Sequence, residues 1–341
     1  MRPRSVTPGP GPLGGAGQVE PAVHRPLDAP WPRNHTSIAE WLCRRFRINR
    51  LTFSKYCFCY LGLLPVLVIY WVFRLEPIAR TFWLSFYDWH LIRPLKPFVG
   101  LANYRELLHD DNFLLALKNT TLFAVLVVGA SVILGLALAV LLSGNLRLTS
   151  AYQAIYFLPV IIPMVPMAIA WKWIFDARHG ILNYVLSWVG VQPIGWLTSP
   201  DVAMWAIILM SVWKVLGYNM VLLLVGLKNI PAVYYEAASI DGAAGWALFR
   251  RITLPLLKPI LLFVIVISTI NAYNVFTQVY VMTTGSQAAP GAPLRVLVFD
   301  IYQNGFQFFK MGYASAEAVV LTLIILALTL VQFRIIRLDG E

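Results

Sequence analysis

Charged side chains are scarce in this sequence. Asp, Glu, Lys and Arg make up 13% of its 341 residues, whereas hydrophobic residues make up 59%. Soluble domains carry roughly 25% charged residues, so the composition excludes an ordinary water-soluble globular protein. It indicates a chain that crosses a membrane several times, and the mean hydropathy of +0.68 supports the same interpretation.

Motifs for nucleotide hydrolysis, metal binding and nucleophilic catalysis are missing as well. The chain has no Gly-Lys pair, and therefore no G-x-x-x-x-G-K-[ST] phosphate loop. Its five His residues lie apart, without the spacing of metal ligands. The three cysteines lie in or just before the first apolar stretch, and their odd number argues against a disulfide framework. We predict no catalytic residue, no metal and no cofactor, and we expect Asp110 and Asp111 to be solvated at a helix start.

Six stretches are apolar and long enough to cross a membrane, which takes about 20 residues. We place them at about 56–73, 119–142, 152–175, 202–224, 259–281 and 313–336. This pattern predicts an all-α membrane protein with six transmembrane helices. Three prolines of the third stretch, Pro159, Pro163 and Pro166, predict a bent helix that is static rather than a moving hinge.

The domain organisation follows from these stretches. Residues 1–55 form a basic tail with nine basic and three acidic residues, and we predict that most of this tail is disordered. Residues 37–50 are predicted either to form an amphipathic helix on the membrane surface or to be a simple basic flank of the first span. The other predicted parts are the first span with an external segment (56–118), a core of five spans (119–336) with a polar loop (228–257), and a short tail (337–341).

Lysine and arginine set the predicted orientation. With the tail inside, the inner segments carry sixteen of these residues and the outer segments carry nine. Cytoplasmic loops are richer in Lys and Arg. Both termini and the polar loop 228–257 are therefore predicted to be cytoplasmic.

The polar loop is predicted to hold two short helices. Pro231 suits a helix start, the stretch 232–240 tolerates a helix, and Gly242 permits the positive φ that ends one. A second helix is predicted from 244 to 251. The alternative interpretation is an interfacial helix that only connects two spans.

The residues of this loop match a known motif. The stretch Tyr-Glu-Ala-Ala-Ser-Ile-Asp-Gly-Ala at 235–243, followed by Ile-Thr-Leu-Pro at 252–255, resembles the EAA loop of binding-protein-dependent ABC importer permeases. The resemblance implies a type I ABC importer permease fold, in which this loop docks on an ATPase. It assigns that coupling role to Glu236, Ala237, Ala238, Asp241 and Gly242: Glu236 for a polar contact, the two alanines for close approach, and Gly242 for the turn.

Other stretches resemble the sugar-type permeases of this family, such as those for maltose and glycerol 3-phosphate. These are Ser-Phe-Tyr-Asp-Trp at 85–89, Phe-Val-Gly-Leu-Ala-Asn-Tyr at 98–104 and Gly-Tyr-Ala-Ser-Ala at 312–316. Glu317 follows the last stretch, and we expect it at the membrane interface. The loop after Met282 departs from the usual Thr-x-Gly-Gly-Pro, so loop contacts with a binding protein do not transfer.

Polar residues in the fifth stretch predict a path for the solute. Asn271, Asn274 and Gln278 recur at helical spacing on one face, with Tyr273 among them. The fourth stretch adds Tyr218 and Asn219. Polar groups inside a membrane usually face the bundle interior or a cavity, and neutral amides and aromatic rings suit a polyhydroxylated solute. Hydrogen bonds between helices are the alternative explanation.

The resemblance further implies several partners. They are a cytosolic ABC ATPase dimer that binds the ATP, a second permease subunit that makes a heterodimer, an extracytoplasmic solute-binding protein, a sugar-like solute and membrane lipid; no nucleic acid is expected. The predicted function is import of a sugar, oligosaccharide, polyol or glycerol 3-phosphate across the cytoplasmic membrane, without enzymatic activity in this chain. The alternatives are a lipid-modifying membrane enzyme and a secondary carrier.

Overall fold

The computed structural model describes residues 50–338 except residues 94, 145–146 and 284–293. The predicted amphipathic helix at 37–50 lies outside this range except for its last residue, and so does most of the loop after Met282. The described residues contain helices and no β-strand, with two isolated β-bridges. An all-helical protein is thus confirmed.

The chain divides into two units, Met1–Tyr70 and Trp71–Glu341. The first holds one described helix, α2 (Arg50–Tyr70), with a proline at position 65. The helices of the second are α3 (Glu76–Leu84), α4 (Ala102–Leu107), α5 (Asp111–Ser143), α6 (Thr149–Ile161), α7 (Met164–Ile174), α8 (Ile181–Ser187), α9 (Pro200–Lys228), α10 (Ala232–Ile240), α11 (Gly245–Leu248), α12 (Leu254–Tyr273), α13 (Thr277–Thr283), α14 (Leu297–Tyr302) and α15 (Met311–Leu338). The described residues of this unit also include three π-helical turns: η1 (Trp71–Leu75) before α3, η2 (Phe249–Thr253) before α12, and η4 (Gln303–Gln307) after α14.

Five helical runs among the described residues are long and apolar enough to cross a membrane, and a bent pair raises the number to six. The bent pair is α6 and α7, which meet at an angle of 98°. The predicted third helix is therefore not one bent helix but two. Pro163 caps α7 in an extended conformation, and Pro166 lies in the first turn of α7, where a missing N–H costs little.

The fifth predicted span is interrupted as well. Helix α12 ends at Tyr273, Asn274 caps it, and α13 begins only at Thr277. The prediction that Asn271, Asn274 and Gln278 share one continuous helical face is therefore wrong. An asparagine ends a helix readily because its side chain competes for backbone hydrogen bonds, and that of Asn274 donates to the Ile270 carbonyl at 2.7 Å.

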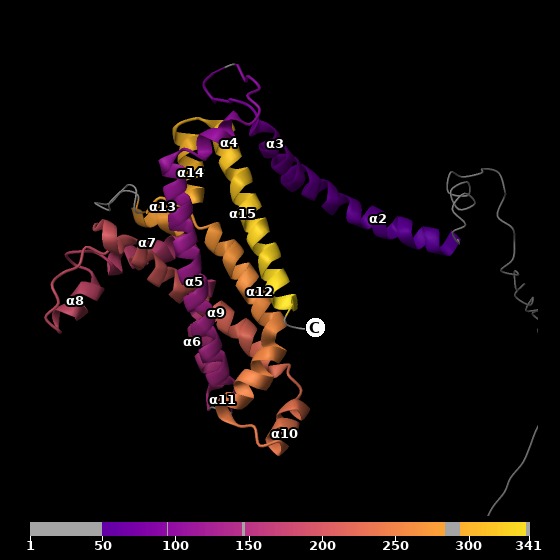
Figure 1. The fold of residues 1–341 in the computed structure, drawn as a ribbon, viewed down its shortest axis with the longest axis vertical. Helices are drawn as coiled ribbons and strands as arrows, with labels where there is room; N and C mark the ends of the chain where they lie inside the picture. The colour runs from indigo at the N-terminus through magenta and orange to yellow at the C-terminus, as the bar shows by residue number, and fades with distance from the viewer. Residues whose placement is uncertain (1–49, 94, 145–146, 284–293, 339–341) are drawn as a thin grey trace, which may run out of the picture. The chain divides into compact units, whose positions relative to one another are not determined.

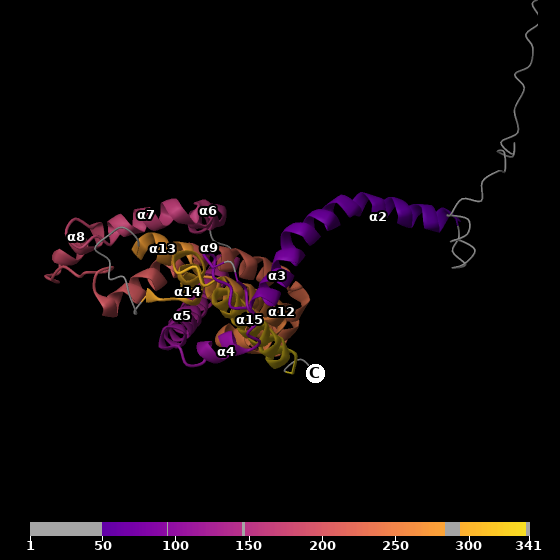
Figure 2. The same cartoon turned by 90° about the horizontal axis from the view of Figure 1, so that it is seen from above.

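Small residues bring the central helices together. Helix α9 packs against α5, α6 and α12. A Cβ atom added to Gly217 of α9 would lie 1.9 Å from the Tyr156 carbonyl oxygen of α6, and one added to Gly135 of α5 would lie 3.2 Å from Met220 N of α9. Backbone therefore contacts backbone at these positions, as in membrane proteins whose helix interfaces use small residues. Helix α7 leads from the break toward α8 at the edge of the unit (Figure 1, Figure 2).

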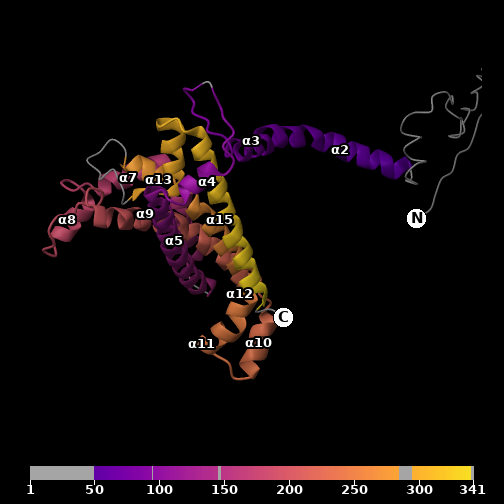
Figure 3. The ribbon, with the colours of Figure 1, turned by 45° about the horizontal axis from the view of Figure 1, so that its top comes forward.

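Two of the sugar-type stretches pack against each other at one end of the second unit. The Asn103 side chain donates to the Ser85 and Tyr87 carbonyls at 2.8 and 3.1 Å, and the Tyr104 and Ser85 hydroxyls lie 2.6 Å apart. Gly312 of the third stretch donates its N–H to the Trp89 carbonyl. The three stretches therefore build one structure. The α10–α11 segment lies at the opposite end of this unit (Figure 1, Figure 3).

Candidate functional site

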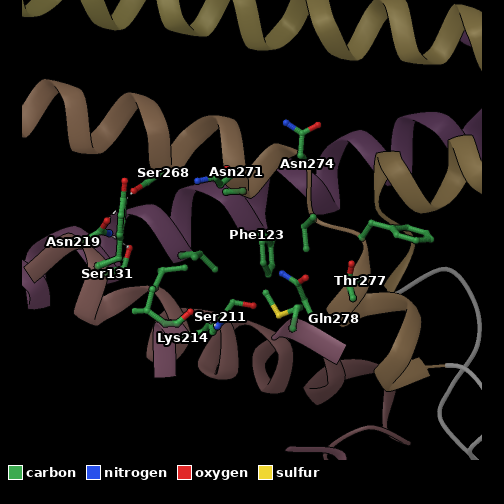
Figure 4. A pocket seen from close by; sticks show the side chains of 18 residues that line it. Phe123, Ser131, Ser211, Lys214, Asn219, Ser268, Asn271, Asn274, Thr277 and Gln278 are labelled. Atoms are coloured by element: carbon green, nitrogen blue, oxygen red, sulfur yellow. Dashed lines mark hydrogen bonds between the residues drawn. The ribbon is translucent and has the colours of Figure 1, made fainter. Parts of the chain in front are cut away.

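A cavity of about 450 Å³ lies between the central helices of the second unit. Figure 4 shows polar side chains around it. Its lining comes from α5, from both sides of the α6–α7 break, and from α9, α12 and α13. The lining residues are Phe123, Val127, Ser131, Val160, Met164, Ser211, Lys214, Val215, Tyr218, Asn219, Ser268, Asn271, Ala272, Asn274, Val275, Phe276, Thr277 and Gln278.

Five of the six residues predicted to form the solute path line this cavity. They are Tyr218, Asn219, Asn271, Asn274 and Gln278. Asn271, Asn274 and Gln278 all line the cavity although α12 and α13 are separate helices, where a single helical face was expected. Placement in the cavity agrees with the prediction, while a role in solute binding stays a prediction.

Tyr273 is the exception. Its side chain is buried, and its hydroxyl lies 3.2 Å from Thr121 Oγ1 of α5. It packs between helices and does not line the cavity. Tyr273 is the last residue of α12, and its position two residues after Asn271 turns it toward α5 rather than inward.

Asn219 joins three helices by hydrogen bonds. Its Nδ2 donates to Ser131 Oγ of α5 at 3.0 Å, and its Oδ1 accepts from Ser268 Oγ of α12 at 3.3 Å (Figure 4). Only 1% of the residue is exposed. For Asn219 the alternative explanation, hydrogen bonding between helices, therefore holds, although the residue also lines the cavity.

The predicted solute path omits several lining residues, above all Lys214 and Ser211. The Ser211 hydroxyl oxygen is buried and has no hydrogen-bond partner among the described residues. A buried hydroxyl without a partner costs free energy, and Ser211 is part of the cavity lining. The signal for Lys214 was available, because a lysine inside an apolar span is costly and usually functional. Ser211, in contrast, looks like any small residue of a helix.

The lining offers amides, hydroxyls and aromatic rings among mostly apolar side chains. Amides both donate and accept hydrogen bonds, as sugar hydroxyls do. Phe123 and Phe276 provide flat apolar faces. Pockets of this type, mostly apolar with a few placed polar groups, hold small molecules, and this one suits a polyhydroxylated molecule.

The α10 segment has the predicted helix bounds. Helix α10 runs from Ala232 to Ile240, and Gly242 takes a φ of +77°, the positive value expected at its end. The N–H groups of Gly242 and Ala243 donate to the Ser239 and Ala238 carbonyls at 3.1 and 2.9 Å. These bonds satisfy carbonyls that a helix end leaves unpaired.

The coupling residues do not all face outward. Glu236, Ala237, Asp241 and Gly242 are exposed, but Ala238 is 6% exposed. Ala238 therefore packs within the chain, and the prediction that both alanines form one approachable surface needs correction. The exposed part of the segment also includes Ile240 at 86% and Trp246 at 73% exposure.

A second buried polar cluster lies at the end where the sugar-type stretches pack. Glu317 is fully buried, and its Oε1 accepts from Asn304 Nδ2 at 2.8 Å. The expectation that Glu317 lies at the interface is therefore wrong, because α14 and η4 fold over the first turns of α15. Asp300 is buried next to it, and its Oδ1 accepts from Arg295 Nε at 2.6 Å. Burial raises the pKa of Asp300, and Arg295 opposes this shift.

Asp110 also differs from expectation, since it is not simply solvated. It caps α5 by accepting from Asn112 N at 2.9 Å, and it accepts from the Tyr313 hydroxyl of α15 at 2.6 Å. Partial burial alone would raise the pKa of Asp110, but the hydrogen bonds from Tyr313 and from the backbone of Asn112 outweigh it and lower the pKa. The carboxylate thus links two helices.

A family model described as "Binding-protein-dependent transport system inner membrane component" matches residues 131–338. The match covers more than half of the chain and includes α9 to α15. The chain belongs to this family. Its members are transporter permeases of the inner membrane, so the permease is an integral membrane protein, and ATP hydrolysis belongs to a separate subunit.

Two curated relatives and a solved structure are similar to the permease. The trehalose/maltose transport system permease protein MalF of Thermococcus litoralis is 35% identical over 289 residues, 85% of this chain and 97% of the relative. The glycerol-3-phosphate transport system permease protein UgpA of Yersinia pestis is 31% identical over 291 residues, with 85% and 97% covered. A solved structure, the crystal structure of a bacterial ABC transporter involved in the import of alginate, contains a chain that matches this one with a TM-score of 0.73 at 24% sequence identity. The match covers 84% of this chain and 98% of that chain. This similarity shows the importer permease fold.

Proposed function

We propose that this chain is the membrane-spanning permease of an ATP-driven importer for a sugar or sugar-like solute. The observation that carries the proposal is the combination of an exposed α10 segment at one end and a polar cavity between the central helices. An enzyme would need a catalytic cluster, and a secondary carrier would not need a docking segment for an ATPase. The family membership favours the importer over both alternatives.

The α10 segment is proposed to dock on a cytosolic ATPase dimer. Exposed Ile240 and Trp246 give it an apolar face, Ala237 allows close approach, and Glu236 offers a polar contact. Apolar and aromatic anchors of this kind carry most of the binding energy in protein interfaces. Asp241 and Gly242 shape the turn after α10, so that movement of the ATPase is passed to α9 and α12.

The other proposed partners follow from the family. The name of the family implies a solute-binding protein. The proposed importer also contains a second permease that differs in sequence from this chain. Both termini of this chain and its α10 segment are proposed to lie in the cytoplasm. The proposed solute path is Tyr218, Asn219, Asn271, Asn274 and Gln278. The relatives' names cover an uncharged sugar pair, trehalose and maltose, and a charged solute, glycerol 3-phosphate, so the charge of the solute needs separate evidence.

Assembly tests the proposal directly. The chain is tagged and purified in mild detergent from cells that express its own neighbouring genes. We expect an ATPase, a second permease and, in the presence of solute, a binding protein to co-purify, with ATP hydrolysis stimulated by the loaded binding protein after reconstitution. A chain that purifies without any ATPase under these conditions contradicts the proposal.

A further inference from the structure

The ammonium group of Lys214 lies at the break between α6 and α7. Its Nζ donates to three backbone carbonyls, those of Pro159, Val160 and Ile162, at 2.6, 3.1 and 2.5 Å. The residue belongs to α9, is 9% exposed and lines the cavity (Figure 4). A side chain of one span thus holds the interrupted backbone of another.

These carbonyls need a partner because of the break. The last carbonyls of a helix have no N–H of their own helix to bond, and Pro163 after the break has no N–H at all. Unsatisfied carbonyls at membrane depth cost several kcal/mol each. The three acceptors require three N–H donors on one nitrogen, which only a protonated ammonium supplies. The negative end of the α6 dipole adds to this attraction.

Gly217 explains how Lys214 reaches the break. The two residues are three positions apart on α9, so they lie on the same face. At Gly217 the backbone of α9 touches that of α6, because an added Cβ would lie 1.9 Å from the Tyr156 carbonyl oxygen. The close approach one turn away brings the Lys214 side chain to the C-terminal end of α6.

We propose that Lys214 is a positioning residue that fixes the cavity wall formed by Val160 and Met164, and that the cavity consequently has no available cation and takes an uncharged solute. The inference deepens the proposed function by naming the charge class of the solute. Among the described residues of the lining, no other Lys or Arg and no Asp or Glu is present. An anionic solute would have to displace one of the three carbonyls from Lys214, whereas a neutral sugar leaves them in place.

The first experiment measures the charge that the cavity presents, without any solute. Cys43, Cys57 and Cys59 are replaced by Ser, and Met164→Cys is introduced at the cavity wall of the full chain in native membranes. The probes are two methanethiosulfonate reagents, an anionic one with a sulfonatoethyl group and a cationic one with a trimethylammonioethyl group. The rate at which each reagent labels the introduced cysteine is divided by its rate of reaction with a small thiol in solution. We expect the two corrected rates to agree within about threefold. An available ammonium would favour the anionic reagent by about tenfold or more, and that result overturns the inference.

The second experiment tests positioning with the neutral methyl methanethiosulfonate as the probe. We expect Lys214→Met to change the labelling rate of Met164→Cys by about fivefold or more, and Lys214→Arg, which keeps charged donors, to restore it within about twofold. Lys172→Met removes a lysine from α7 that does not line the cavity, and should leave the rate unchanged. Equal labelling of the Lys214→Met and parent chains contradicts the inference.

Folding and function are kept apart in this design. If Lys214→Met fails to reach the membrane, Lys214→Gln keeps two N–H donors without the charge and is expected to give an intermediate labelling rate. A rate for Lys214→Gln equal to that of the parent would also contradict the inference. Labelling needs neither ATP nor solute, so its result does not depend on the proposed importer function. A chain that does not associate with an ATPase contradicts the proposed function, whereas the labelling rates alone contradict the inference about Lys214.

Discussion

Replacement of Gly217 by Ala tests the central packing of the permease. The added Cβ would lie 1.9 Å from the Tyr156 carbonyl oxygen, whereas an ordinary contact begins at 3.4 Å, so α9 and α6 would have to separate by the difference, 1.5 Å. Backbone atoms of two helices meet at this point, and no flexible side chain can give way. The separation also stretches the 3.1 Å bond from Lys214 to the Val160 carbonyl beyond hydrogen-bonding range.

The expected loss follows from these two effects. Overpacking of a close contact costs about 1–3 kcal/mol. A weakened hydrogen bond to a charged group adds about 1.5–3 kcal/mol. Some relaxation of the helices reduces the sum, so we expect Gly217→Ala to lower the free energy of unfolding by about 3 kcal/mol.

Gly129→Ala is the matched control, because it is also a glycine of a long membrane helix but has nothing within 4 Å of an added Cβ. Alanine favours a helix by up to about 1 kcal/mol over glycine, so this variant should be as stable as the parent or slightly more stable. The assay is reversible unfolding in mixed micelles, followed by circular dichroism for the three proteins. Equal stability of the two variants would refute the argument that backbone contact at Gly217 holds α6 against α9.

Three further changes test other parts of the account. Gly242→Val forces a β-branched residue into a φ of +77° at a cost of about 1–2 kcal/mol; we expect normal membrane levels and a loss of most uptake, measured as transport by whole cells. Glu317→Gln keeps a hydrogen-bonding group beside Asn304 and should alter stability by less than about 1 kcal/mol, whereas Glu317→Ala leaves a void and an unpaired amide and should cost about 2–4 kcal/mol in the same unfolding assay. Hydrogen bonds lower the pKa of Asp110 in the folded chain, so the Asp110 carboxylate stabilises the fold above its ordinary pKa of about 3.8, and this contribution is lost as the pH falls through the lower folded value. Heat stability should therefore fall less between about pH 5 and 3 in Asp110→Asn than in the parent. An identical decline in the two proteins would contradict this role of Asp110.

Local patterns in the sequence predicted the α10 segment well. Pro231 and Gly242 delimit a helix by their own backbone preferences, and neither depends on distant parts of the chain. The observed bounds, Ala232–Ile240, and the positive φ of Gly242 agree with this prediction. The burial of Ala238 was not predictable in the same way, because it depends on packing against the following segment.

Residues that depend on contacts between distant segments could not be placed from the sequence. Lys214 bonds carbonyls more than fifty positions away, and the proline pattern alone did not show which proline breaks the span. Tyr273 lies in a polar run, yet it packs on α5. Glu317 lies near a helix start like many exposed glutamates, and only the fold of α14 over α15 buries it.

The central claim is that the α10 segment transmits movement between an ATPase and the cavity. Its most direct test is a disulfide between Ala237→Cys and a cysteine placed in the cleft of the co-purifying ATPase, in the assembled importer lacking other reactive cysteines. We predict a rapid crosslink that abolishes solute-stimulated ATP hydrolysis, and recovery of hydrolysis after reduction, whereas Met311→Cys at the opposite end gives no crosslink. No crosslink from Ala237→Cys, or one that leaves stimulated hydrolysis intact, would contradict the account.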